Sequence, residues 1–165
     1  MPQHAQRPAL RVRDARSEDF PAVHDVHSDA VRRTCATHYG FAERKAWLAG
    51  RSPEGYSRGQ ALGERFVVAV IRTTVVGFAS WRGDELTALF VSPSWQFHGI
   101  GRALVRACER RAHRAGCWLR RVNSTLNARS FYQRLGFLVV SRRYSLRNGR
   151  RVGHYEMRRL VRPRS

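Results

Sequence analysis

The middle of the chain, from residue 65 to residue 115, constrains the fold more than any other part. Three extended segments, Arg65–Ile71, Val75–Trp81 and Glu85–Val91, follow one another there with only short turns between them. They are rich in apolar and β-branched residues, and such runs joined by tight turns are typical of antiparallel neighbours in one sheet. Pro93 then ends the third segment. The chain must therefore build a sheet and cover its faces.

A long amphipathic segment, Gly99–Ala115, supplies part of that cover. Its apolar side chains recur at the spacing of one helical face, at Ile100, Ala103, Leu104, Ala107 and Cys108. This pattern predicts an α-helix that packs one stripe against the sheet. Gly116, directly behind it, is typical of the residue that follows a helix end.

The flanking segments complete one α/β domain. Ahead of the sheet we expect a strand at Leu10–Arg13, a helix behind Ser17 as N-cap, a helix near Phe41–Ala49, and a loop with one helical turn at most over Arg51–Gly63. Behind the long helix we expect a strand at 117–122, a helix at 128–135, and a hairpin of 137–146 and 152–160 around Asn148-Gly149. The order β-α-α-β-β-β-α-β-α-β-β predicts a mixed, mostly antiparallel central sheet flanked by helices. The 165 residues suit a single domain, residues 1–165, with its core at about 10–161.

The turn Gln96–Gly101 is the first candidate for chemistry. It joins a strand to the long helix, and its two glycines let backbone N–H groups approach a ligand closely. A helix N-terminus adds free N–H donors and a positive dipole end, so the turn suits an anion such as a pyrophosphate. Taken alone, the same glycines are equally consistent with an ordinary tight turn. No Gly-Lys-Ser/Thr tail follows, and no third glycine stands at dinucleotide spacing, which excludes the common nucleotide-binding loops.

Two blocks resemble the signatures of the GNAT superfamily of N-acetyltransferases. The first is Leu89-Phe90-Val91-Ser92-Pro93 followed by Gln96-x-x-Gly99-x-Gly101-x-x-Leu104. The second is Asn127-Ala128-x-x-Phe131-Tyr132-x-x-x-Gly136-Phe137. They stand in the family's order, and the resemblance covers about residues 10 to 161. The early His27, the Tyr39 region and the Trp47 helix look most like a small bacterial branch of uncharacterised acetyltransferases.

The resemblance implies a binding site for the co-substrate acetyl-CoA. The backbone of Leu89, Phe90 and Val91 would bond the pantetheine arm like an added strand. The turn would hold the pyrophosphate, through Gln96, Phe97, His98, Gly99, Ile100, Gly101 and Arg102. Asn127 would position CoA, although capping the helix 128–135 explains this residue equally well.

The resemblance also implies direct transfer of an acetyl group to an amine, with Tyr132 as the general acid. A phenol with a pKa of about 10 can protonate a thiolate whose thiol has a pKa of about 8.5. The alternative for Tyr132 is a core aromatic beside Phe131. Glu85 is the candidate general base, or else a hairpin residue that faces solvent. His27, Tyr39 and Trp81 are expected to line the acceptor pocket.

The charge of the chain suggests a competing function. Thirty-one basic residues against 12 acidic ones give a net charge of +19, which would attract polyanions. A non-catalytic module that binds CoA or polyanions, associated with nucleic acid or ribosomes, is therefore the alternative. No motif that reads nucleic acid accompanies the arginines, so nonspecific polyanion attraction is expected.

The remaining expectations concern cofactors and location. The cysteines Cys35, Cys108 and Cys117 show no paired spacing, and the histidines form no ligand pattern, so no metal and no disulfide is expected. No run approaches the roughly 20 apolar residues that span a bilayer. We expect a cytoplasmic protein without a membrane partner, which can form a homodimer. Its acceptor is expected to be a small-molecule or peptide amine, whose identity the sequence leaves open.

Overall fold

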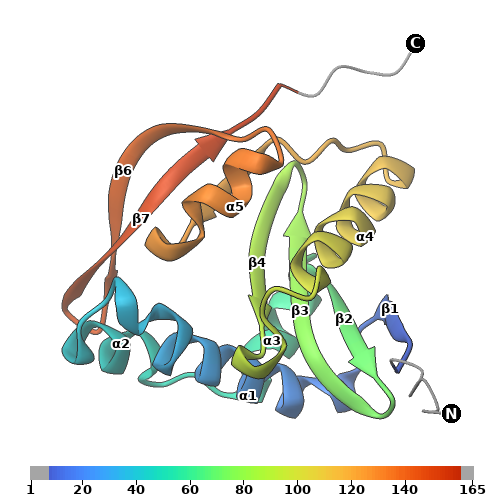
Figure 1. The fold of residues 1–165 in the computed structure, drawn as a ribbon, viewed down its shortest axis with the longest axis horizontal. Coiled ribbons are helices and arrows are strands. Elements are labelled where there is room, and N and C mark those ends of the chain that lie inside the picture. The colour runs from blue at the N-terminus through green and yellow to red at the C-terminus, as the bar shows by residue number, and fades with distance from the viewer. Residues whose placement is uncertain (1–7, 161–165) are drawn as a thin grey trace, which may run out of the picture.

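The computed structural model describes residues 8–160, which fold around one seven-stranded sheet (Figure 1). The strands are β1 Leu10–Asp14, β2 Arg65–Ile71, β3 Thr74–Arg82, β4 Glu85–Val91, β5 Arg121–Ser124, β6 Leu138–Arg147 and β7 Arg150–Arg158. The α-helices are α1 Phe20–Arg32, α2 Phe41–Leu48, α3 Pro53–Ala61, α4 Ile100–Arg114 and α5 Arg129–Arg134. The spatial order is β1-β2-β3-β4-β5-β7-β6, and only β4 and β5 pair in parallel. The predicted α/β class with a mixed, mostly antiparallel sheet is confirmed.

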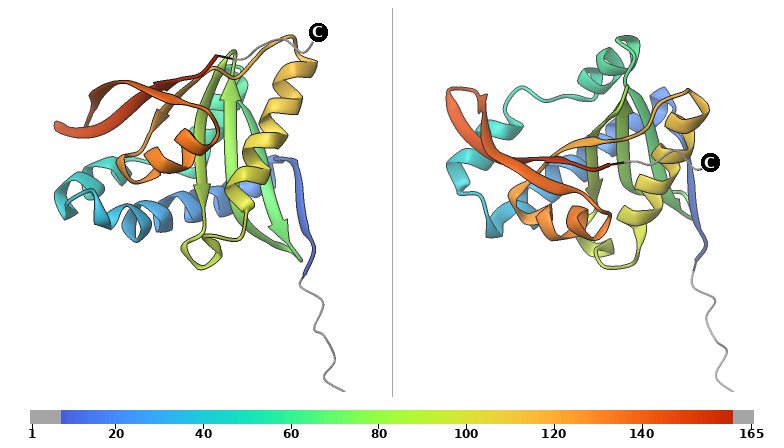
Figure 2. Two further views of the ribbon diagram at one scale, coloured as in Figure 1. Left: turned by 45° about the horizontal axis from the view of Figure 1, so that its top comes forward. Right: turned by 90° about the horizontal axis from the view of Figure 1, so that it is seen from above.

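Helices cover both faces of the sheet (Figure 2). On one face, α1 and α3 pack on an aromatic cluster built from Phe20, Tyr56, Phe66 and Phe78. On the other face, α4 packs across β1 to β4 through the predicted apolar stripe. Gly77 of β3 allows this close approach, because a Cβ there would lie 3.1 Å from Leu104 and 3.3 Å from Ile100.

Three local predictions were wrong. The segment 51–63 forms α3 instead of a loop, because Pro53 opens the helix and Tyr56 is buried on the sheet. Strand β5 begins at Arg121 instead of Cys117. Ser17 does not cap α1: it starts a short 3₁₀ turn, in which the carboxylate of Asp19 accepts a hydrogen bond from the amide of Arg16 at 2.7 Å.

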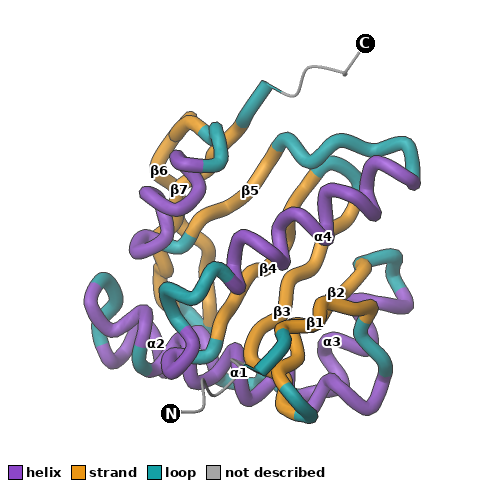
Figure 3. Tube along the Cα trace, turned by 45° about the vertical axis from the view of Figure 1, so that its right-hand side comes forward, coloured by secondary structure: helices purple, strands orange, loops and turns teal. Residues whose placement is uncertain are grey.

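The sheet opens between β4 and β5 (Figure 3). These strands pair only at Glu85 with Arg121 and Leu86 with Val122, after which β5 continues along β7 instead. From Thr87 onward, the edge of β4 that faces β5 therefore has no strand partner. Such an edge offers backbone donors and acceptors to an extended ligand.

Within residues 8–160, no helix is both long and apolar enough to cross a membrane.

Candidate active site

A cavity of about 670 Å³ lies beside the turn that precedes α4; we call it the loop cavity. Most of the residues predicted to bind the co-substrate line it: Leu89, Phe90, Val91, Gln96, Phe97, Gly99, Ile100, Gly101, Arg102 and Asn127. Tyr132, the predicted general acid, lines it as well. His98 does not line it, since its side chain is exposed and its Nδ1 lies 2.7 Å from the carbonyl oxygen of Gln96. The fold thus brings both sequence blocks to one groove.

The turn presents free backbone amides to the loop cavity. Phe97 and Gly99 both have positive φ, 62° and 77°, which turns the chain sharply into the helix. Ala103 is the first residue of α4 whose amide bonds backward, to Gly99 at 3.1 Å. Within the described part of the chain, the amides from Phe97 to Arg102 donate to no backbone carbonyl. Six N–H donors at a positive helix end form a site for an anion.

Two further features fit a ligand in this groove. A Cβ on Gly101 would lie 3.3 Å from the ring of Phe131, so glycine lets α5 approach the start of α4. The Oδ1 atom of Asn127 is buried and has no hydrogen-bond partner within residues 8–160. Asn127 does not cap α5, whose N-cap position is held by Ala128 without a side-chain bond. A buried acceptor of this kind is costly unless a ligand pairs with it.

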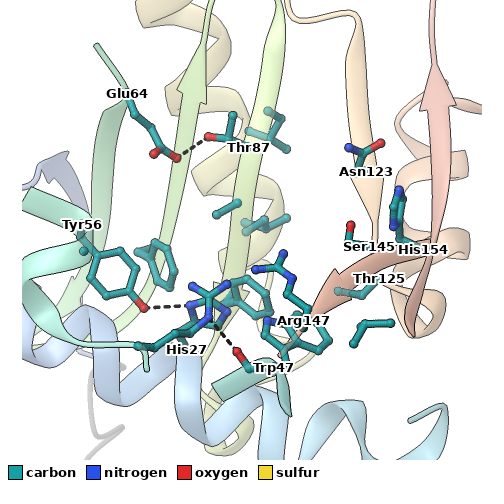
Figure 4. A pocket seen from close by; sticks show the side chains of 18 of the residues that line it. His27, Trp47, Tyr56, Glu64, Thr87, Asn123, Thr125, Ser145, Arg147 and His154 are labelled. Carbon is teal, nitrogen blue, oxygen red and sulfur yellow. Dashed lines mark hydrogen bonds between the residues drawn. The ribbon is translucent and has the colours of Figure 1, made fainter. Parts of the chain in front are cut away.

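A second cavity of about 500 Å³ lies on the face covered by α1 and α3 (Figure 4); we call it the aromatic cavity. Its wall includes the rings of His27, Tyr39, Trp47, Tyr56, Phe66, Phe78 and Phe90. The imidazole of His27 stacks on Phe90 with centroids 4.2 Å apart, and its Nδ1 lies 2.8 Å from the hydroxyl of Tyr56. Burial, and then the charges of Arg51 and Arg147, hold the pKa of His27 well below its usual value. His27 is therefore neutral at physiological pH.

The two cavities meet at Tyr132. Leu89, Phe90, Thr125 and Tyr132 line both of them, so a group in the loop cavity can reach the aromatic cavity beside the tyrosine. Tyr132 is buried, and burial, with the neighbouring Cys108 thiol, raises the pKa of its phenol. Among residues 8–160 its hydroxyl has no hydrogen-bond partner, so it is a protonated donor free to serve a ligand.

Two carboxylates line the aromatic cavity. Glu85, predicted from the sequence, lies at the start of β4 with an oxygen 3.7 Å from Arg121. Glu64 was missed, because it stands alone before a strand and no motif marks it. Its Oε1 accepts hydrogen bonds from the hydroxyls of Ser80 and Thr87, each at 2.7 Å. Both acids are candidates to receive a proton or to bind a cation.

The structure does not bring Trp81 to the site. Its ring is buried on the face that α4 covers, and it lines neither the loop cavity nor the aromatic cavity.

Tyr39 lines the aromatic cavity, but its hydroxyl is engaged: it donates to Gly153 O at 2.6 Å and accepts from Leu126 N at 2.9 Å. Tyr39 therefore ties the loop after β5 to β7.

The two buried cysteines, Cys35 and Cys108, are not activated nucleophiles. Burial raises the pKa of the Cys35 and Cys108 thiols to about 12, so both stay protonated at neutral pH. Within residues 8–160, no cluster of three His, Cys, Asp or Glu side chains is arranged to hold a metal ion.

Comparison with known proteins shows which proteins this chain resembles. Residues 62–139 match the family model described as the acetyltransferase (GNAT) domain, which spans both sequence blocks as far as Val139. An uncharacterized N-acetyltransferase of Escherichia coli, YafP, is 25% identical over 134 residues, covering 79% of this chain and 83% of the relative. Residues 62–139 are thus similar to the GNAT acetyltransferase domain.

Solved structures share this GNAT fold over nearly the whole chain. A GCN5-related N-acetyltransferase from Rhodopseudomonas palustris superposes with a TM-score of 0.82 at 24% identity, covering 93% of this chain and 96% of the other. The PaiA N-acetyltransferase of Thermoplasma acidophilum, solved in complex with coenzyme A, gives 0.73 at 20% identity, with coverages of 93% and 99%. YncA of Salmonella typhimurium, solved with its cofactor acetyl-CoA, gives 0.67 at 22% identity, with coverages of 95% and 96%.

Proposed function

We propose that this chain is an N-acetyltransferase that moves an acetyl group from acetyl-CoA directly to an amine. One observation carries the proposal: Tyr132 lies where the loop cavity and the aromatic cavity meet. A donor in the first cavity and an acceptor in the second would react beside this hydroxyl. Holding two reactants together in this way accounts for a large share of the rate enhancement in group transfer.

The loop cavity would bind acetyl-CoA. Its pyrophosphate would accept hydrogen bonds from the amides of 97–102, with Arg102 adding positive charge. Its pantetheine arm would lie along the open edge of β4 at Leu89 to Val91, as an added strand. The buried Oδ1 atom of Asn127 would accept a hydrogen bond from an N–H group of the pantetheine arm. The thioester would then lie beside Tyr132.

The aromatic cavity would bind the acceptor amine. The neutral amine attacks the thioester carbonyl carbon, a C–N bond forms, and the C–S bond breaks as the tetrahedral intermediate collapses. The departing thiolate takes the proton of Tyr132, while the proton from the nitrogen passes to a carboxylate of the aromatic cavity, directly or through water. The raised pKa of Tyr132 keeps the phenol protonated but also makes it a weaker acid, so transfer requires a thiolate that is likewise withdrawn from water and thereby made more basic.

Replacement of Tyr132 by phenylalanine tests the acid. Tyr132→Phe is expected to lower kcat by about 10²- to 10⁴-fold, the usual contribution of a general acid, while the Kd for acetyl-CoA stays within twofold. Thiol release over a panel of amines measures the rate, and titration calorimetry measures binding. The exposed Tyr144→Phe is the matched control. Equal turnover by Tyr132→Phe at every pH would remove this residue from the acid role.

Separate replacements of the two carboxylates identify the base. Glu85→Gln and Glu64→Gln each remove one proton acceptor at nearly constant volume. The variant that lacks the base is expected to lose the acidic limb of the kcat/KM–pH profile, whereas the other keeps it. Retention of that limb by both variants would assign proton removal to water alone.

The competing hypothesis of a CoA- or polyanion-binding module makes the opposite prediction. It requires steeply salt-dependent binding of nucleic acid together with no acetyl transfer to any amine. The net charge of +19 motivates it. Transfer to any amine in the panel would exclude a purely binding role.

A further inference from the structure

Three arginine side chains, Arg51, Arg58 and Arg147, line the aromatic cavity without a carboxylate partner, and of these Arg58, on α3, is exposed. Arg51 follows α2, and Arg147 is the last residue of β6. The seven ion pairs formed within residues 8–160 use other arginines, and none of these three takes part. The side chains of Arg51 and Arg147 are half-buried. A guanidinium that is partly withdrawn from water and has no carboxylate partner favours an anionic ligand.

The fold builds this arrangement from two distant segments. At the tip of the β6–β7 hairpin, Asn148 Nδ2 donates to the carbonyl oxygens of Ala46 at 2.8 Å and Ala49 at 3.3 Å. The hairpin is thereby fastened to the end of α2. Arg51 is anchored on the same helix, since its Nε donates to Trp47 O at 3.1 Å. The Arg51 guanidinium also interacts with the Tyr56 hydroxyl, and its other N–H groups, like those of Arg147, are available to a ligand.

The positive charges of Arg51 and Arg147 repel each other, and both lie near the imidazole of His27. Burial lowers the pKa of Arg147, and the nearby charge of Arg51 lowers it further. Figure 4 shows Arg147 and His27 at one end of the cavity. The Nε2 atom of His27, whose side chain is 95% buried (5% exposed), has no hydrogen-bond partner within residues 8–160. A bound carboxylate would pair with both guanidinium groups and would accept a hydrogen bond from this imidazole.

The other end of the cavity carries the opposite charge. Glu64 lies there beside Thr87, as Figure 4 shows, and Glu85 lines the same wall two residues before Thr87. Positive charge at one end and negative charge at the other suit a zwitterion. The two carboxylates also disfavour a dianionic phosphate in so small a space.

We infer that the acceptor amine also carries a carboxylate, as a free amino acid does, and that Arg51 and Arg147 hold this carboxylate. The inference rests on the proposed function, because it names the acceptor class for the same site. The aromatic walls would take the rest of the molecule. Arg51 and Arg147 thus determine specificity, and they do not take part in the chemistry.

A panel of matched acceptors tests the inference in the full-length protein. The panel contains the free amino acids, the corresponding amino acid amides, and the amines that lack the carboxyl group. Thiol release with acetyl-CoA gives kcat and KM, and thermal shift gives binding without turnover. We expect kcat/KM for the best free amino acid to exceed that of its amide by at least about tenfold, as one charge-assisted contact implies.

Variants assign the preference to the two arginines. Arg147→Gln and Arg51→Gln are each expected to raise KM for the free amino acid about 10- to 100-fold, with kcat for the amide and KM for acetyl-CoA within twofold of wild type. Arg150→Gln is the matched control, because Arg150 is exposed, pairs across the hairpin with Arg147 and lines neither cavity. It is expected to behave as wild type.

The outcomes separate this inference from the proposed function. Transfer to amides or simple amines as fast as to amino acids, or a preference that survives both variants, overturns the inference and leaves the proposed function standing. Amino acid binding that depends on both arginines, without transfer, supports the carboxylate site and contradicts the acetyltransferase. If the protein neither binds amino acids nor transfers an acetyl group, both the inference and the proposed function are contradicted.

Discussion

Single residues in the loop cavity fulfil two requirements at once, and Gly101 is the clearest case. Its missing side chain gives room to the ring of Phe131, 3.3 Å from where a Cβ would lie. Its amide is also one of the unpaired donors at the start of α4. Glycine here therefore serves both the packing of α5 and the approach of a ligand to the backbone.

Gly101→Asp is expected to weaken acetyl-CoA binding at least about tenfold, because it places a carboxylate among the amides that would hold the pyrophosphate. Titration calorimetry measures the Kd. Gly40→Asp adds the same charge at the exposed N-cap of α2, away from both cavities, and should leave the Kd unchanged. Gly101→Ala separates crowding of Phe131 from charge. An unchanged Kd in Gly101→Asp would show that the turn is not the binding site.

At the scale of elements, the β6–β7 hairpin depends on Asn148. This residue adopts φ 47° beside Gly149 at φ 78°, the left-handed pair that a two-residue hairpin turn requires. Its side chain also donates to the last carbonyls of α2. One residue therefore shapes the hairpin and connects it to α2, the helix that precedes Arg51.

Replacement of Asn148 separates these two contributions. Asn148→Gly keeps the turn and loses the side-chain bonds, so we expect about 1 kcal/mol less stability and a raised KM for the acceptor, as Arg147 loses its position. Asn148→Ala also strains the left-handed backbone and should cost roughly 1 kcal/mol more. Urea unfolding and acceptor kinetics measure both effects. Equal stability of the two variants would argue against backbone strain.

Prediction from sequence succeeded where a pattern repeats locally and failed where contacts between distant segments decide. The stripe of α4 and the Asn148-Gly149 turn are short-range signals, and both elements formed as expected. Helix α3 was missed because its sequence has a weak helix pattern. The helix is stabilised instead by long-range packing, through the burial of Tyr56 against the sheet. Trp81 was misplaced since alternation along a strand does not say which face meets a cavity, and β3 has an irregular register between Ser80 and Trp81.

The same distinction explains which site residues could be found. The turn at 96–101 and Tyr132 belong to contiguous motifs, whereas Glu64, Arg51 and Arg147 reach the aromatic cavity from three separate segments. No spacing in the chain relates these three. Only the folded arrangement shows that acidic and basic groups occupy opposite ends of one cavity.

For the whole molecule, burial of a histidine links stability to pH. The folded-state pKa of His27 lies well below 6.5, its ordinary value, so above pH 6.5 neither the folded nor the unfolded chain protonates it. Below pH 6.5, His27 binds a proton in the unfolded chain but stays neutral in the folded protein. Stability is therefore full above pH 6.5 and falls as pH drops, by up to about 1.4 kcal/mol per pH unit, until the folded-state pKa is reached.

Urea unfolding at pH 7.5, 6.5 and 5.5 measures this linkage. His27→Phe keeps an aromatic ring against Phe90 but cannot titrate, so the loss of stability between pH 6.5 and 5.5 should shrink. It should not vanish, because burial also lowers the pKa of His154 and acts with the same sign. The lowered carboxyl pKa values of Asp19 and Asp84 act only near and below pH 4, outside this window. A slope in His27→Phe identical to that of the wild type would show that His27 is not the linked group.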